Sequence, residues 1–134
     1  MMDDETPRAW IPTEGGTTIG AAGPEGGRVV QDVEWADPDD PEDADARLTV
    51  EVSGEATVVV AQLHGGWMRR VERFATSTSA EQGTQWLRTE LERLAGMIPY
   101  EEDRDVPRKV RELLAAVDDS LAIRLPGAEH AAGS

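Results

Sequence analysis

The residues best suited to chemistry in this 134-residue chain lie around one predicted hairpin turn. An imidazole titrates near neutral pH and guanidinium groups bind anions, so together they form a candidate anion or ligand patch. Its residues are His64, Arg69, Arg70 and Arg73. The competing interpretation places them at solvent-side positions of a hairpin, paired with nearby glutamates. We favour this interpretation because cross-strand ion pairs are common.

An acidic run is the second candidate, because carboxylate oxygens are the ligands that Ca²⁺ prefers. Residues 36–45 hold six carboxylates in ten positions. The spacing does not fit an EF-hand, since Asp37, Asp39 and Asp43 are not followed by the required glycine and no glutamate closes the loop. Two prolines and the lack of an apolar anchor predict a solvated hairpin loop without a metal.

The rest of the sequence offers few groups for catalysis. The chain has no cysteine and two histidines, of which His130 lies near the C-terminus. The glycine-rich residues 15–27 lack the Gly-Lys-Ser/Thr ending of a phosphate loop, so they predict turns around a short extended piece at residues 17–19. No pattern places two carboxylates in an apolar cleft. We expect no catalytic residue, cofactor or metal, and an enzyme is the less favoured class.

The negative charge is unevenly distributed. The formal net charge is −14, yet residues 47–98 carry six arginines and six glutamates. The excess therefore lies in the flanks, which repel nucleic acid and anionic membranes and attract cationic partners. Acidity of this kind is also typical of proteins kept soluble by charge, of GC-rich genomes and of salt-adapted hosts.

Three β-rich segments in succession predict a meander over residues 47–52, 56–63 and 67–74. For the first hairpin, a two-residue turn at Ser53-Gly54 and a three-residue loop over residues 53–55 are both conceivable. The longer loop sets Leu48 beside Val60 and Val50 beside Val58, so it is preferred. In the second hairpin, the glycines at 65 and 66 suit a primed turn, which pairs Val60 with Val71 and Leu63 with Met68.

Two amphipathic helices are expected after the meander. The first follows a capping box, Ser79 with Gln82 or Thr78 with Glu81, and ends between Gly96 and Pro99. Its apolar stripe is Trp86, Leu87, Leu91, Leu94 and Ile98. The second is capped by Asp105 and has Pro107 in its first turn. Its apolar stripe is Val106, Val110, Leu113, Leu114, Val117 and Leu121.

The chain is expected to form one α+β domain over residues 10–125. Residues 28–35 predict a fourth strand with Val29, Val33 and Trp35 on one face, and Trp10 is expected to dock on the domain. The fold class is an antiparallel β-meander of about four strands with one or two C-terminal helices packed on one face. Residues 1–9 are expected to be a disordered acidic tail and residues 126–134 a flexible tail.

A second apolar face is predicted on the sheet. If Leu48, Val50, Val58 and Val60 face the first helix, the residues that alternate with them point the other way. Soluble monomers rarely expose such a patch, so residues 10–19, the second helix, a second copy or another protein must cover it. The candidate interface residues are Val59, Leu63, Trp67, Met68 and Phe74.

The sequence also bounds the compartment. The acidic start of the chain lacks the basic and apolar regions of a signal peptide, and the longest apolar run is too short for a membrane span. The lack of cysteine fits a reducing compartment. We expect a cytoplasmic protein without a membrane partner.

The chain resembles a family of small uncharacterised bacterial α+β proteins. The resemblance covers most of residues 10–100 and implies one compact α+β domain, without an activity, cofactor or site attached. Its motifs are Trp10-x-Pro12-Thr13, Gly26-Gly27, Asp32-x-Glu34, Ala46-Arg-Leu-Thr-Val50, Gly66-Trp67-Met68, Phe74 and Ile98-Pro99.

Two functions remain open on the sequence. The favoured one is a non-catalytic protein-binding or regulatory module, such as an immunity protein, antitoxin or chaperone, whose acidic flanks bind a basic protein. The alternative is a small homodimeric ligand-binding domain or enzyme, with a pocket between sheet and helices gated by the histidine and arginines of the candidate patch.

Overall fold

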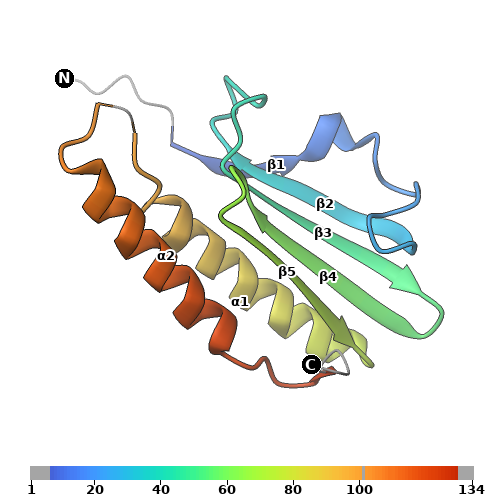
Figure 1. The fold of residues 1–134 in the computed structure, drawn as a ribbon. Helices are drawn as coiled ribbons and strands as arrows, with labels where there is room; N and C mark the ends of the chain where they lie inside the picture. Colours follow the sequence, from blue (N-terminus) through green and yellow to red (C-terminus); the bar gives the residue numbers. More distant parts are fainter. Residues whose placement is uncertain (1–6, 101, 130–134) are drawn as a thin grey trace.

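The computed structural model describes residues 7–100 and 102–129, which form an antiparallel sheet and two helices (Figure 1). The α+β class and the meander are confirmed, because the six strands lie in the sheet in chain order. Both helices lie on the same face of the sheet. The elements are β1 (Ala9–Pro12), η1 (Thr13–Gly16), β2 (Arg28–Ala36), β3 (Ala46–Ser53), β4 (Ala56–Leu63), β5 (Met68–Phe74), α1 (Ser77–Ala95), α2 (Val106–Ala122) and β6 (Ala128–Glu129).

The strand count is higher than expected because two short strands extend the sheet at its edges. Strand β1 pairs with the end of β2, and Trp10 lies opposite Trp35. Strand β6 pairs with the end of β5, where Ala128 lies opposite Phe74. The expected flexible tail therefore includes a strand, and residues 130–134 lie outside the described part. Residues 1–6 of the expected acidic tail also lie outside it, whereas Arg8 forms an ion pair of 3.1 Å with Asp45.

The predicted register of the first hairpin is wrong. Ser53 pairs with Ala56, so the turn consists of Gly54 and Glu55, and Gly54 has a φ of +62°. Only glycine adopts that conformation without strain, and this places the turn one residue later than the preferred loop. The second hairpin has the predicted register, with Val60 opposite Val71.

The one-residue shift exchanges the two faces of β4. Val59 lies opposite Val50, and both point toward the helices. Val58 and Val60 turn to the other face, where the N-terminal segment packs. The interface expected at Val59, Leu63, Met68 and Phe74 is therefore wrong, because these side chains are buried under the helices. Trp67 is half-buried at the margin of this core.

A bulge in β2 corrects a second prediction. The pairing with β3 shifts between Val29 and Gln31, so Val29 points to the face opposite that of Val33 and Trp35. Trp10 of the edge strand β1 and Trp35 of the neighbouring β2 face the helices. The rings of Trp10 and Trp35 lie 5.4 Å apart, and Trp10 Nε1 donates to Glu92 Oε2 of α1 at 2.9 Å.

Helix α1 is capped earlier than predicted, since the Thr76 hydroxyl accepts from the backbone N–H of Ser79. Its buried stripe lies on β3 to β5, and the backbone of Gly83 lies against the Phe74 ring. The helix ends at Ala95 with Gly96 as its C-cap, so Ile98 of the predicted stripe lies beyond the helix. The buried residues are Ala80, Gly83, Leu87, Leu91, Leu94 and Ala95.

Helix α2 begins at the predicted cap, where the Asp105 carboxylate accepts from the N–H of Arg108. Its buried side consists of Leu113, Val117 and Ser120. Leu114 and Leu121 were expected in the apolar stripe but are 46% and 43% exposed. The helix lies at the margin of the sheet, so only one side of it reaches the core.

Candidate functional site

The structure does not bring the predicted anion patch together. Arg69 and Arg73 lie on the face of β5 away from the helices, where they pair with Glu25 at 2.8 Å and Glu129 at 3.8 Å. Arg70 points to the opposite face and is buried. His64 lies beyond the end of β4, 3.8 Å from Glu34. The favoured interpretation of paired hairpin residues therefore fits better than a shared anion site. The expected acidic partners are Glu51, Glu55 and Glu72, and Arg70 pairs with Glu72, whereas the partners of the other three residues differ from those expected.

Arg70 joins β5 to the end of α2. Its guanidinium donates to the carbonyl oxygen of Ser120 at 2.8 Å, to that of Ile123 and to Glu72 Oε2 at 2.6 Å. It also lies 5.5 Å from the centre of the Trp86 ring. The last carbonyl groups of a helix lack intrahelical donors, so a buried guanidinium satisfies them and complements the helix dipole. This role is structural.

The face of the sheet away from the helices contains a buried polar cluster. The Asp32 side chain is fully buried and accepts from Arg47, from the Thr13 hydroxyl at 2.9 Å and from the Thr49 hydroxyl at 3.1 Å. Burial raises the pKa of Asp32, but the hydrogen bonds from Arg47 and Thr13 outweigh it and hold the pKa below its ordinary value. The carboxylate is thus kept ionised, which suits a fixed structural anchor.

A second buried carboxylate holds the glycine-rich segment. Glu51 is fully buried, and its two oxygens accept from the backbone N–H groups of Gly27 at 2.8 Å and Glu25 at 2.9 Å. A Cβ atom at Gly23 would lie 2.3 Å from the Glu51 carboxyl carbon. Thr49 and Glu51 alternate with apolar residues, which is typical of a strand face in contact with solvent. The sequence signal for a covering segment was its glycines, such as Gly23 and Gly27, because a backbone without side chains can pack closely on this face.

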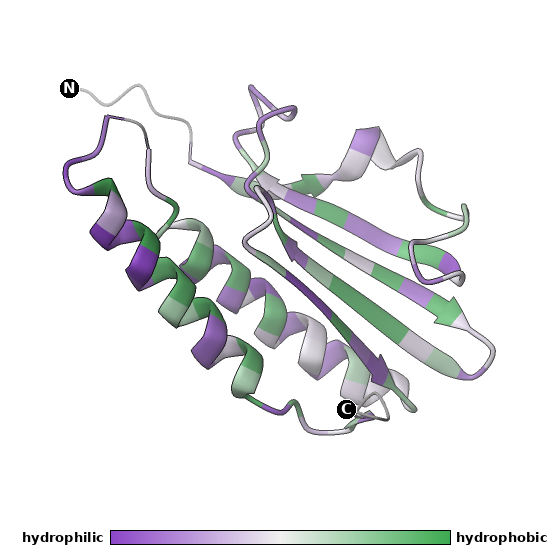
Figure 2. Cartoon of the chain, viewed as in Figure 1, coloured by the Kyte–Doolittle hydropathy of each residue, from purple (hydrophilic) through white to green (hydrophobic). Residues whose placement is uncertain are grey.

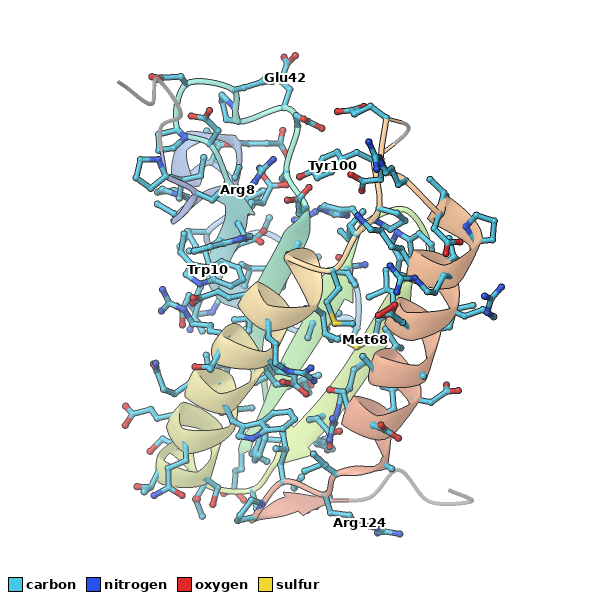
Figure 3. All side chains as sticks on the ribbon, turned by 90° about the vertical axis from the view of Figure 1, so that its left-hand side faces the viewer. Arg8, Trp10, Glu42, Met68, Tyr100 and Arg124 are labelled. Carbon is cyan, nitrogen blue, oxygen red and sulfur yellow. The ribbon has the colours of Figure 1, made fainter. Side chains whose placement is uncertain are left out.

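Two acidic segments that are far apart in the sequence lie at the same end of the molecule. The β2–β3 loop and the α1–α2 connector are both at this end, near the labels Glu42 and Tyr100 in Figure 3. The loop and the part of the connector next to α2 are largely purple, and so hydrophilic, in Figure 2. We call this surface the acidic end. Its carboxylates are Asp37, Asp39, Asp40, Glu42 and Asp43 of the loop and Glu102, Asp103 and Asp105 of the connector.

The β2–β3 loop is ordered by its own hydrogen bonds and by Arg8. Asp37 Oδ1 accepts from the N–H of Asp39 at 2.9 Å, and Arg8 donates to the carbonyl oxygen of Asp43 at 3.4 Å. Burial raises the pKa of Asp45 at the base of the loop, although Arg8 opposes the shift. Asp40, Glu42 and Asp43 are exposed. The loop therefore presents its carboxylates from a defined backbone.

The connector adds an exposed aromatic ring to the acidic end. Tyr100 is 53% exposed, and its N–H donates to Asp103 Oδ2 at 2.7 Å. That hydrogen bond holds the pKa of Asp103 below its ordinary value. A hollow of about 340 Å³ lies beside the ring, between Met97, Lys109 and the end of α1. Aromatic side chains beside hollows are frequent anchors in protein interfaces.

A groove of about 410 Å³ lies between α1 and strands β2 to β4. Its floor is apolar and includes Val30, Val50 and Val52, and its rim carries Glu81 and Arg88 as charged residues. The pocket expected between sheet and helices thus has a counterpart. None of the four residues of the predicted patch lines it.

Within residues 7–100 and 102–129, no group of three or more His, Cys, Asp or Glu residues is arranged to hold a metal ion. The two helices found there are too short or too polar to cross a membrane. Comparison of the chain with protein-family models, curated proteins and solved structures gave no match.

Proposed function

We propose that this protein is a non-catalytic binding module, of the immunity-protein, antitoxin or chaperone type, whose acidic end binds a basic protein. The observation that carries the proposal is that the β2–β3 loop and the α1–α2 connector lie at the same end of the molecule (Figure 3). Charges gathered on one surface attract a cationic partner more strongly than the same charges dispersed over the chain.

The composition of the acidic end supports this choice of partner. The loop carries six carboxylates over residues 36–45 and no basic residue. Carboxylates repel the phosphates of nucleic acid and of anionic lipids, so a basic protein is the partner that this surface fits. Tyr100 supplies an exposed ring that a partner can bury, which adds a short-range contact to the electrostatic attraction. The lack of cysteine suits the cytoplasm as the place of action.

A capture experiment with three forms of the protein tests the proposal. The first is the unchanged chain, and the second removes three exposed carboxylates of the loop (Asp40→Asn, Glu42→Gln, Asp43→Asn). Each form is immobilised, exposed to cell extract and washed at increasing NaCl, and the retained proteins are identified by mass spectrometry. We expect the unchanged chain to retain basic proteins and to release them as salt shortens the screening length from about 10 Å to about 3 Å.

The third form is the matched control. It removes three exposed carboxylates outside the loop (Glu55→Gln, Glu81→Gln, Asp119→Asn), so the net charge is the same as in the loop variant. Retention by the control together with loss by the loop variant would support the acidic end as the binding surface. Equal retention by both variants, or retention that does not depend on salt, would contradict the proposal.

The groove between α1 and the sheet favours a second candidate, a small ligand-binding domain. Its volume of about 410 Å³ and its apolar floor suit a small molecule. A metabolite panel scored by melting temperature tests this candidate, with a Thr84→Trp variant that fills the groove from its rim. A ligand that raises the melting temperature of the unchanged chain but not that of the variant would support this candidate. A panel in which no compound raises the melting temperature would count against it.

A further inference from the structure

One side of α2 is apolar and uncovered. Leu114 and Leu121 are 46% and 43% exposed, and Ile123 just beyond the helix is 46% exposed. These are three of the seven large hydrophobic residues that are exposed in the described part of the chain. Leu114 and Leu121 are two helical turns apart, so they lie on one stripe, which the half-buried Val110 continues. Figure 3 shows α2 at the margin of the helix layer, with α1 on its other side.

The net charge of α2 changes sign from one end of the helix to the other. The N-terminal half carries three basic residues, Arg108, Lys109 and Arg111, against one acidic residue, Glu112, whereas the C-terminal half carries Asp118 and Asp119 and no basic residue. Arg111 and Asp118 are exposed and flank the apolar stripe, and in the described part of the chain neither has an ion-pair partner. A helix with this charge order complements a copy of itself that runs in the opposite direction.

We propose that the exposed side of α2 binds α2 of a second copy of this chain in antiparallel orientation, about a two-fold axis between Leu114 and Ala116. This arrangement sets Val110 opposite Leu121 of the second copy. It brings Arg111 within reach of Asp118 of the second copy, and the two-fold symmetry forms that ion pair twice. The apolar stripe is then buried beside the two ion pairs, which lie on one side of it because Arg111 and Asp118 are two helical turns apart.

Electrostatics favours the antiparallel orientation over a parallel one. The acidic end adjoins the N-terminus of α2, so a parallel pair would place two acidic ends side by side. The 17 residues of α2 span about 25 Å at ~1.5 Å per residue, which exceeds the ~8 Å screening length at physiological salt. An antiparallel pair keeps the acidic ends at opposite poles, where they remain open to a partner. The dimer goes beyond the proposed function and does not depend on it.

Sedimentation velocity from about 5 to about 500 μM tests the proposal, with charge-reversed variants of the intact chain. Arg111→Glu sets two acidic groups against each other, and Asp118→Arg does the same with two basic groups. We expect each to weaken the dimer on the order of tenfold, and the double variant to restore it. General charge repulsion predicts a different result. Asp118→Arg replaces a negative charge by a positive one and so reduces the formal net charge from −14 to −12, and repulsion alone would therefore strengthen the dimer.

Two variants at exposed apolar residues complete the experiment. Leu114→Asp places a charge on the stripe and is expected to abolish the dimer. Ile19→Asp changes a residue that is 49% exposed elsewhere and is expected to leave the dimer unchanged. Because both side chains are exposed, we expect both variants to fold, which circular dichroism checks. A chain that stays monomeric to 500 μM, a dimer that survives Leu114→Asp, or a double charge reversal that fails to restore association would each overturn the proposal.

Discussion

Arg47 of β3 donates two hydrogen bonds to Asp32 of β2, from Nε to Oδ1 at 2.9 Å and from Nη2 to Oδ2 at 2.6 Å. The Thr13 hydroxyl reaches the same carboxylate from the segment that follows β1. One carboxylate therefore fixes the N-terminal segment over the face of the sheet away from the helices. This explains how the chain covers that face itself.

Asp32→Asn is expected to lower the free energy of unfolding at pH 7 by about 2–4 kcal/mol, because breaking a buried ion pair typically costs about 3–5 kcal/mol and Arg47 is partly exposed. The measurement is urea unfolding followed by tryptophan fluorescence. A difference below about 0.5 kcal/mol, the usual range for surface substitutions, would show that the pair does not stabilise the fold.

The same pair predicts a pH dependence. The pKa of Asp32 in the folded protein lies below its ordinary value of 3.8, so folding favours the ionised form. Its contribution is fully present above pH 3.8 and is lost as the pH falls through the lower, folded pKa. The difference in unfolding free energy between the unchanged chain and Asp32→Asn should therefore be constant near pH 7 and shrink in acid. A difference that grew in acid would contradict this assignment.

Arg47→Met is expected to reverse the sign of this dependence. The substitution leaves a buried carboxylate without its cation, so burial then dominates and raises the pKa of Asp32. A raised pKa means that protonation stabilises the folded state. The variant should thus gain stability, relative to Asp32→Asn, as the pH is lowered from 7. Parallel pH profiles of the two variants would count against the ion pair as the cause.

Glu51→Ala is expected to loosen the glycine-rich segment. It removes the acceptors of the Gly27 and Glu25 N–H groups, and a lost hydrogen bond to a charged group typically costs about 1.5–3 kcal/mol. Limited proteolysis with trypsin reports the segment directly, because the exposed Arg28 follows it. Glu51→Gln keeps one carbonyl acceptor, so its rate of cleavage at Arg28 should lie between those of the unchanged chain and Glu51→Ala. Unchanged cleavage at Arg28 in Glu51→Ala would show that other contacts hold the segment.

The sequence was sufficient for strands β2 to β5, the two helices and their order, because hydrophobic period and helix caps are local signals. The Asp105 cap, the end of α1 at Gly96 and the pairing of Val60 with Val71 were all predictable. The register of the first hairpin was not. Either face of β4 is apolar, so hydrophobic matching could not distinguish Val59 from Val60 as the partner of the helices.

The short strands and buried carboxylates depend on contacts between distant parts of the chain, which local pattern does not encode. Strands β1 and β6 have four and two residues, too few to show a period. Glu51 alternates with apolar residues as a solvent-facing residue would, and only the covering segment distinguishes it. The acidic end was predictable as composition, but the location of its two segments at the same end of the molecule required the fold.

Gly83→Ala should destabilise the protein, although the same change usually stabilises a helix interior by about 0.5–1 kcal/mol. A Cβ atom at this position would lie 2.3 Å from the tip of the Phe74 ring. Overpacking of this kind typically costs about 1–3 kcal/mol. Gly96→Ala is the matched control, because a Cβ atom there meets nothing closer than 3.5 Å. Phe74→Leu removes the ring tip, so its cost should be less than additive with that of Gly83→Ala.

Arg70→Met is expected to detach the end of α2 from the sheet. It leaves the carbonyl group of Ile123 without its guanidinium donor, that of Ser120 with only the N–H of Ile123, and the largely buried Glu72 without a cation, and losing one partner of a buried ion pair costs about 3–5 kcal/mol. Arg69→Met is the control, because its exposed pair with Glu25 contributes only about 0–1 kcal/mol.

Hydrogen exchange distinguishes a local effect of Arg70→Met from a global one. If Arg70 joins α2 to β5, amides of α2 exchange faster while those of β3 and β4 stay protected, because the central strands keep their own ladder and core. Uniform acceleration across the chain would instead mean that α2 and the sheet unfold as one unit, and that the guanidinium stabilises the whole domain.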